Sequence, residues 1–399
     1  MVLITIKARE ASLKRRLRAH FRELGFQRDA SGLLCNGDRT KESYRRAHHV
    51  QRAAKLHKDR EFLRDANRNF LQFLASGSEV LPERISPRLE LIDAGTWQSQ
   101  LFRFVTHSWS VPVSEGYGRR LRFLVWDGSN GKLIGVIALG DAVFNLGARD
   151  QIIGWDQRIR RERLVNVLDA YVLGAVPPYN FLLAGKLIAC LVRTREVVEV
   201  FRNKYGKSTG IISKKRKRAQ LVLATTTSAL GRSSVYNRLV LGGERYFEPI
   251  GYTSGWGHFH IPDHLFSDMR DYLRLKHDRY ASNHRFGEGP NWRFRAVRQT
   301  LGLLGMNEGL VQHGFVREIF ASYIATNAIP YLRGHARRAD YSTLLNVSEV
   351  SDLAIERWMH PRAGRRPEYR TWQAEHFSLA FANGLGREVS QRRVDGLRG

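Results

Sequence analysis

The sequence predicts an α+β protein with a helical N-terminal arm over residues 1–80, a mixed-sheet core over 86–280 and an arginine-rich, mostly helical region over 281–399. Three observations predict this organisation. Apolar residues recur at helical spacing up to about residue 76, and strand-like and helix-like runs alternate from about residue 86. Lysine is then absent after Lys276, whereas eighteen arginines remain.

The N-terminal arm is predicted from its apolar periodicity. Leu13, Leu17, Phe21 and Leu24 follow at spacings of four, four and three, which predicts one apolar stripe on an otherwise basic helix, with Gly25 as its C-cap. A second basic helical stretch covers 42–75. Together the arginines of these helices predict a DNA-facing arm.

The core is predicted from alternating elements. A β-hairpin is expected where "LRFLVWD" and "LIGVIALGD" flank the turn "GSNGK". We then expect a helix over 162–176, a strand over 219–227, a short helix over 233–241, a strand pair within 245–261 and a helix over 263–275. The boundary near 280 follows from the loss of lysine and from the loop "RFGEGPNWRFRAVR".

The net charge of +27 exceeds what solubility requires and predicts attraction to a polyanion. DNA or RNA is the favoured partner. An anionic membrane surface is the alternative, but the basic segments lack the continuous apolar face of an interfacial helix. No run approaches a membrane span, and Cys35 and Cys190 form neither a disulfide framework nor a zinc site, so we expect a cytoplasmic protein with no membrane partner.

Several ordered motifs resemble one family. "LRFLVWDGSNGKLIGVIALGDAVFNLGARDQIIGWD", "NKYG", "VYNRL", "GYTSGWGHFHIPD", "GEGPNWR" and "HGFVREIF" are similar to the DruA family, which is named after a component of the Druantia anti-phage defence system and has relatives linked to mobile elements. The resemblance covers roughly residues 86–335. It implies a DNA-directed role in defence or transposition, with defence-system or mobile-element proteins as partners.

The first catalytic hypothesis rests on "GWGHFHIPD". On a strand, His258 and His260 would point to the same side, as metal ligation requires, and Asp263 is the candidate third ligand. The pattern resembles the histidine-hydrophobic-histidine motif of single-strand endonucleases and transposases, which implies Mg²⁺ or Mn²⁺. The candidate tyrosine nucleophiles are Tyr236, Tyr272 and Tyr280. The competing interpretation is that the two histidines are polar surface or phosphate-positioning groups.

The second hypothesis concerns the core. "AVPPYNFLLAGKLIACLV" followed by "LVLATTTSALGRSSVYNRLVL" resembles the core of GNAT-type acetyltransferases, in which a turn before a helix cradles the coenzyme A pyrophosphate and a tyrosine, here Tyr236, serves as general acid. The turn around Gly185 lacks the usual arginine and paired glycines. The resemblance therefore predicts a GNAT-like scaffold more than an acyltransferase.

The third hypothesis is nucleic-acid binding without chemistry. "GPNWRFRAVR" interleaves aromatic and guanidinium side chains, which suits base stacking beside phosphate contacts. The candidate binding residues are Lys214, Lys215, Arg216, Lys217, Arg218, Trp292, Arg293, Arg295, Arg298, Arg158 and Arg161. Later arginines repeat the pattern: Arg333, Arg337, Arg338, Arg362, Arg365 and Arg366. Each arginine alone is a solvated surface group, and only the set indicates nucleic acid.

The segment 145–164, "NLGARDQIIGWDQRIRRERL", joins a core strand to a helix. We expect Arg149 and Asp150 to form an ion pair that shapes the turn, and Trp155 to be a packing anchor. Mg²⁺ ligation by Asp150 and Asp156 is the less favoured alternative, because no third carboxylate follows at a matching spacing.

Three functions remain open from the sequence. The first is a DNA-binding protein of anti-phage defence or transposition that cleaves or joins DNA. The second is a non-catalytic DNA-recognition subunit that recruits a nuclease or helicase. The third is a GNAT-like acyltransferase.

Overall fold

The computed structural model describes residues 2–28, 30, 34–35, 40–113, 118–207, 218–258, 260–282, 290–306, 308–311 and 315–382. The chain divides into two compact units. Unit 1 comprises Met1–Lys55, Ala229–Gly231 and Thr253–Arg317, and unit 2 comprises Leu56–Ser228, Arg232–Tyr252 and Glu318–Gly399. Each unit combines segments that are far apart in the sequence, so the units do not correspond to the sequence domains predicted with boundaries near residues 80 and 280. Those boundaries stay predictions.

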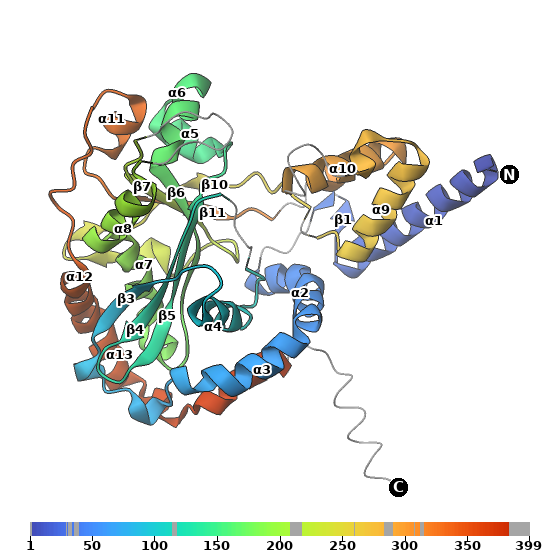
Figure 1. Ribbon diagram of the computed structural model, residues 1–399. Helices are drawn as coiled ribbons and strands as arrows, with labels where there is room; N and C mark the ends of the chain where they lie inside the picture. The colour runs from blue at the N-terminus through green and yellow to red at the C-terminus, as the bar shows by residue number, and fades with distance from the viewer. Residues whose placement is uncertain are drawn as a thin grey trace, which may run out of the picture. The chain divides into compact units, whose positions relative to one another are not determined.

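Unit 2 is built on one mixed sheet (Figure 1). In the described part of the chain, seven strands form it in the order β10, β11, β7, β6, β5, β4, β3. They are β3 (Pro87–Leu91), β4 (Arg120–Asp127), β5 (Lys132–Asp141), β6 (Val167–Ala175), β7 (Leu223–Thr227), β10 (Glu248–Tyr252) and β11 (Glu318–Tyr323). Neighbours are antiparallel except β6 and β7, which run parallel with Asp169 opposite Thr225. A separate ribbon pairs β8 (Val240–Leu241) with β9 (Glu244–Arg245).

The hairpin of β4 and β5 shows why this sheet is the centre of unit 2. Both strands are almost wholly buried, and alternate side chains pack on opposite faces. Phe123 and Val125 join the core under α7 (Ala184–Cys190), whereas Leu124 and Trp126 join the core under α4 (Trp97–Thr106). The predicted hairpin is confirmed.

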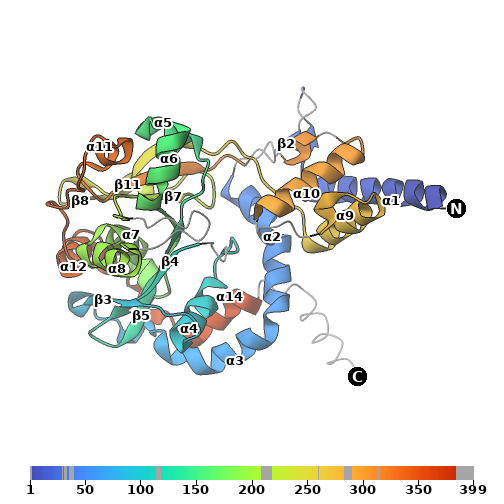
Figure 2. The same ribbon diagram turned by 45° about the horizontal axis from the view of Figure 1, so that its top comes forward.

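Helices cover both faces of the sheet of unit 2 (Figure 2). One face carries α7, α8 (Arg195–Tyr205) and α12 (Val347–Ala354), and α12 continues through a π-helical turn (Ile355–Met359) into α13 (His360–Arg365). The other face carries α3 (Arg60–Phe70), α4 and α14 (Leu379–Ala382). At one end of the sheet lie α5 (Gly147–Ile153), α6 (Gln157–Arg163) and α11 (Ala328–Arg333).

Two expectations for this sheet are wrong. The helix predicted over 162–176 is strand β6, because Val167, Leu168, Ala170 and Val172 are buried by layers on both faces and read as a continuous apolar run. No strand pair forms between described residues of 245–261: β10 pairs with β11, a strand of the region predicted to be mostly helical, and Arg245 ends β9, whose partner is β8.

Unit 1 is helical apart from the short pair β1 (Gln27–Arg28) and β2 (Leu34–Cys35) in its described residues. Its helices are α1 (Val2–Glu23), the part of α2 (Lys41–Lys58) up to Lys55, α9 (Asp263–Leu275) and α10 (Pro290–Leu303). The predicted stripe of α1 is buried in one core with Met269 and Leu273 of α9. The helix predicted over 263–275 is confirmed, and none of the described helices is both long and apolar enough to cross a membrane.

Alanine at Gly135 should destabilise unit 2. The new Cβ would overlap the backbone carbonyl oxygen of Gly174 on β6, and the central strands have no room to separate. Overpacking of this kind lowers the free energy of unfolding by about 3 kcal/mol. Urea denaturation measures the change, with Gly364→Ala on α13, where a Cβ meets open space, as the control. Equal stability of the two variants would contradict this view of the sheet.

Candidate nucleic-acid interface

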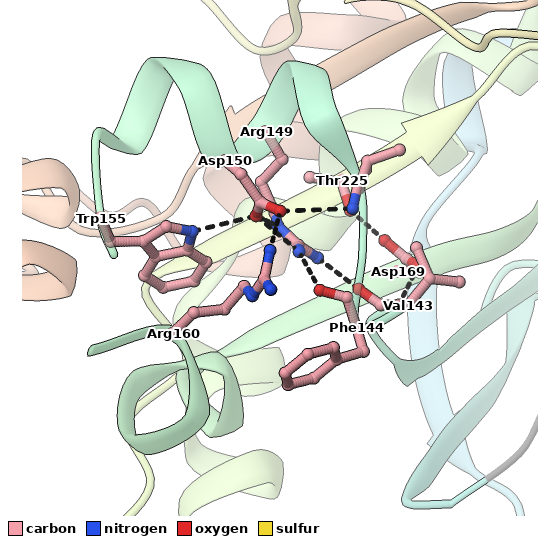
Figure 3. Close-up of polar contacts among 9 residues, drawn as sticks. Val143, Phe144, Arg149, Asp150, Trp155, Arg160, Asp169 and Thr225 are labelled. Atoms are coloured by element: carbon pink, nitrogen blue, oxygen red, sulfur yellow. Dashed lines mark hydrogen bonds and ion pairs between the residues drawn. The ribbon is translucent and has the colours of Figure 1, made fainter. Parts of the chain in front are cut away.

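The segment that links β5 to α6 is organised by a buried arginine (Figure 3). Arg149 on α5 is 0% exposed, and its Nε and Nη2 donate to Asp150 Oδ1 at 3.0 and 2.7 Å. Asp150 also accepts from Trp155 Nε1 at 2.9 Å and from Arg160 Nη1 at 2.7 Å. Burial alone would raise the pKa of Asp150, but the hydrogen bonds and charge of Arg149 outweigh it and lower that pKa. The expected ion pair and the packing role of Trp155 are confirmed.

The same arginine fixes the loop that follows β5. Arg149 Nη1 donates to the carbonyl of Val143 at 2.7 Å, and Nη2 donates to that of Phe144 at 3.0 Å. The backbone N–H of Val143 in turn donates to Asp169 Oδ2 at 3.1 Å, and the Thr225 hydroxyl donates to Asp169 Oδ1. Burial raises the pKa of Asp169. The loop is therefore tied to both parallel strands, while the side chains of Val143 and Phe144 stay exposed.

Two local signals place α6 after this loop. Gly154 adopts φ 67° and ends α5, a conformation that glycine takes without steric penalty. The Asp156 side chain then caps α6 by accepting from the N–H of Ile159 at 2.7 Å. Asp150 and Asp156 thus have structural roles, as expected, and neither is needed as a magnesium ligand to explain its position.

Helix α6 packs against α11, which lies far along the sequence (Figures 1 and 2). The Arg163 guanidinium lies 5.2 Å from the centre of the Tyr331 ring, and Arg333 Nε donates to the carbonyl of Ile153. Exposed arginines gather on these two elements and the turn after α11. We call them the α6–α11 surface: Arg158, Arg161, Arg333, Arg337 and Arg338. Within it, Arg158 Nη1 lies 4.0 Å from Glu162 Oε1, one helical turn along α6.

The histidine motif has a different geometry from the one predicted. His258 lies in a bend and His260 in a turn before α9, so the expected strand is wrong. His260 is 2% exposed, is packed against the rings of Phe21 and Phe26, and has Nε2 3.0 Å from the carbonyl of Leu310. Burial lowers the pKa of His260 to about 3. These contacts are those of a core histidine.

Asp263, the candidate third ligand, is exposed and pairs with Arg293 at 2.6 Å. Burial, followed by the charge of Arg293, lowers the pKa of His258 to about 4. Among the described residues, no group of three or more His, Cys, Asp or Glu side chains is arranged to hold a metal ion. The geometry therefore lends no support to the metal hypothesis for His258, His260 and Asp263.

The candidate tyrosine nucleophiles are held by other contacts. Tyr272 is buried on α9 and donates to Glu10 Oε1 at 2.8 Å, and burial raises its pKa. Tyr280 accepts from Arg279 Nη2 at 3.1 Å. Tyr236 belongs to unit 2, where its ring packs at 5.2 Å from those of Phe247 and Phe320 and burial raises its pKa. A raised pKa opposes ionisation of the hydroxyl that attack on phosphate requires.

The aromatic candidate for base stacking is in the core of unit 1. The segment predicted as a loop contains α10, and Trp292 is 6% exposed with its ring edge-on to Phe266. Arg293 is partly buried and donates to the carbonyl of Ile261 at 2.6 Å, whereas Arg295 and Arg298 are exposed. Lys214, Lys215, Arg216 and Lys217 lie outside the described residues, and Arg218 is exposed.

The comparisons with known proteins identify the family. A family model described as Druantia protein DruA matches residues 38–334. The protein named Druantia protein DruA of Escherichia coli (strain UMEA 4076-1) is 52% identical over 373 residues, which cover 94% of this chain and 92% of that protein. The chain belongs to the DruA family. The resemblance found in the sequence is confirmed. No solved structure matches.

In this DruA-family protein, the matched region contains the whole Arg149 network, α6 and Arg333, whereas Arg337 and Arg338 lie beyond it. The sequence interpretation missed Asp169 and Thr225 as members of the network, and it missed α11 as the partner of α6. The sequence did contain one signal for this contact, the aspartate inside the apolar run "VLDAYVLGA". If that run is a strand, its aspartate lies opposite a residue of the neighbouring parallel strand.

Proposed function

We propose that this protein is a DNA-recognition component of an anti-phage defence system and that the α6–α11 surface contacts the phosphate backbone. Membership of the DruA family supports the role in defence. The net charge of +27 supports a polyanionic partner. The single observation that carries the assignment to this surface is its construction: exposed arginines stand on a helix whose base is fixed by the buried Arg149–Asp150 network.

This construction suits phosphate contact. Arg158 and Arg161 are three residues apart on α6 and therefore neighbours on one helix face. A guanidinium group binds phosphate through two N–H groups in a fixed fork, so less side-chain freedom is lost when its backbone is already rigid. The exposed side chains of Val143 and Phe144 lie at the loop held by the same network. A rigid basic helix beside a small apolar loop can bind a nucleic acid without any catalytic residue.

Recruitment of a nuclease or helicase by a non-catalytic subunit is the form of this function that the geometry favours. His260 and the three tyrosines serve as core or hydrogen-bonded groups, so cleavage assisted by Mg²⁺ or Mn²⁺ stays a sequence-based hypothesis. The GNAT-like core also stays a prediction. β6, α7 and β7 follow in the expected order of strand, helix and strand. Tyr236, however, lies in a 3₁₀ turn (Tyr236–Arg238) before strand β8, so the helix predicted over 233–241 is wrong.

Charge reversal on α6 tests the proposal. We expect Arg158→Glu/Arg161→Glu to weaken binding of a DNA duplex by about 100-fold at low salt and to lower the salt-dependence slope by about 2, because two phosphate contacts are lost. Fluorescence anisotropy at several salt concentrations measures both quantities. The matched control is Arg202→Glu/Lys204→Glu on α8, which makes the same charge change on exposed residues of unit 2.

The control separates a site from a general charge effect. If both double variants lose affinity equally, the α6–α11 surface is not the binding site and net charge alone explains the attraction. If wild-type protein binds neither single- nor double-stranded DNA, the proposed function is wrong. Incubation of bound DNA with Mg²⁺ or Mn²⁺ also shows directly whether the protein cleaves it.

A further inference from the structure

The exposed ring of Phe144 lies on a loop whose backbone is fixed by buried groups (Figure 3). Arg149 donates to the carbonyls of Phe144 and Val143 at 3.0 and 2.7 Å, and the N–H of Val143 donates to Asp169 at 3.1 Å. Phe144 is nevertheless 42% exposed and Val143 37% exposed. Because contact of apolar carbon with water is unfavourable, a backbone that holds two apolar side chains at the surface points to a ligand that covers them.

The Arg160 guanidinium covers one face of this ring, with its Cζ atom 4.5 Å from the ring centre. Arg160 Nη1 donates to Asp150 Oδ2 at 2.7 Å, so the network that fixes the loop also holds this cation in place. Figure 3 shows the Phe144 ring beside the Arg160 side chain. Arg160 belongs to α6, which also carries the exposed Arg158 and Arg161. The ring is therefore a rigid platform that stands on a cation and adjoins exposed arginines.

A flat, uncharged group that is attached to negative charge fits this platform. Every nucleobase has such a face, and aromatic side chains bind single-stranded nucleic acid by stacking on it. The phosphates beside the base suit the arginines of α6. Inside an intact duplex both faces of each base are already stacked on neighbouring bases, so the ring has no base face to contact. An unpaired base offers one.

We infer that Phe144 stacks on an unpaired base of DNA, so that the protein prefers DNA with a single-stranded segment over an intact duplex. This inference rests on the proposed function, because the α6–α11 surface holds the neighbouring phosphates. The arginines favour a nucleotide over an apolar side chain of a partner protein, since only the nucleotide brings phosphates to them. The rigid loop adds to the affinity, because little conformational freedom is lost when the base binds.

Two DNA ligands with the same backbone test the stacking contact on the full-length protein. One is a duplex with a single-stranded thymidine tail, and the other is the same duplex with an abasic tail. Their phosphate charge is equal, so the ratio of the two affinities measures the contribution of the bases alone. By fluorescence anisotropy we expect wild-type protein to bind the thymidine tail about tenfold more tightly, and Phe144→Ala to bind both tails equally.

The variants keep the loop and change the ring. Phe144→Ala retains the backbone carbonyl that Arg149 holds, and Phe144→Leu, which keeps an apolar side chain without an aromatic face, replaces it if it does not fold. Phe144→Tyr keeps the ring and should retain the preference for the thymidine tail. The matched control is Phe181→Ala, since Phe181 is 38% exposed in unit 2 and its carbonyl also accepts from an arginine, Arg362.

Loss of the preference in Phe144→Ala, with the affinity for plain duplex unchanged and Phe181→Ala like wild type, supports the stacking contact. The inference is overturned if wild-type protein binds both tails equally, if Phe144→Ala keeps the preference, or if Phe181→Ala loses it to the same extent. Its failure is distinguishable from failure of the proposed function, which is tested on plain duplex. Weaker duplex binding by Arg158→Glu/Arg161→Glu, with no effect of the tail bases, would remove only the stacking contact.

Discussion

Alanine at position 150 is expected to lower the free energy of unfolding of unit 2 by about 4 kcal/mol, because removing one member of a buried ion pair leaves the other charge uncompensated. Arg149 is 0% exposed in the folded protein, so removing the carboxylate leaves its buried charge without the partner that compensates it. Trp155 Nε1 and Arg160 Nη1 lose the same acceptor. Urea denaturation followed by circular dichroism measures the loss.

Two further variants of the same segment provide reference values for this loss of stability. Asp156→Ala removes an exposed helix cap and should cost about 1 kcal/mol. Asp150→Asn keeps an oxygen acceptor without the charge, so its stability should fall between those of the two alanine variants. A loss in Asp150→Ala no larger than in Asp156→Ala would show that the network does not organise this end of the sheet. If α6 contacts DNA as proposed, Asp150→Ala should also weaken DNA binding, because Arg160 of α6 loses its carboxylate partner.

Local signals in the sequence were sufficient for the elements whose contacts are local. The β4–β5 hairpin has its turn residues between two apolar runs, and α9 shows its apolar spacing from Asp263 to Leu275. Arg149 and Asp150 are adjacent in the chain, so their ion pair could be predicted without the fold. Asp156 precedes α6 and caps it, which is again a contact within one turn.

The wrong predictions concern residues whose structural contacts are with residues far away in the sequence. The segment of strand β6 was predicted to be a helix because it is apolar on both faces. Only its pairing with β5 and β7 shows that it is a strand. His260 reads as a surface ligand because the phenylalanines around it, Phe21 and Phe26, come from the N-terminal segment. Trp292 reads as exposed for the same reason, since its partner Phe266 lies on α9.

The candidate sites depend on such contacts even more strongly. Arg158 and Arg161 were predicted individually, but their joining with Arg333 requires α11 to pack on α6.

Three histidines of unit 1 are expected to make it acid-sensitive. The pKa values of His48 and His258 are lowered to about 4 and that of His260 to about 3, each from 6.5, with burial as the largest cause. Between pH 6.5 and 4 the unfolded chain therefore binds more protons than the folded one, and the free energy of unfolding falls as the pH is lowered. One such histidine contributes about 3 kcal/mol of loss by pH 4.

The charges around these histidines reinforce this direction. Arg317 Nη2 lies 2.7 Å from His48 Nε2, and Arg293 acts on His258, so protonation of either imidazole places two cations together. Hydrogen exchange of the α9 and α10 amides, corrected for intrinsic rates, should show protection falling from pH 7 to pH 4.5, with little change in β4 and β5 of unit 2. Unchanged protection in α9 and α10 would contradict the prediction.

His260→Leu should make the pH dependence of unit 1 shallower, because it removes the histidine with the lowest pKa while keeping an apolar side chain between Phe21 and Phe26. The matched control is His264→Leu, which makes the same substitution at an exposed position of α9. A catalytic or metal-binding His260 predicts a different result: loss of activity or of metal binding with the acid sensitivity unchanged. The two variants therefore show whether His260 of the motif "GWGHFHIPD" is a core histidine or a metal ligand.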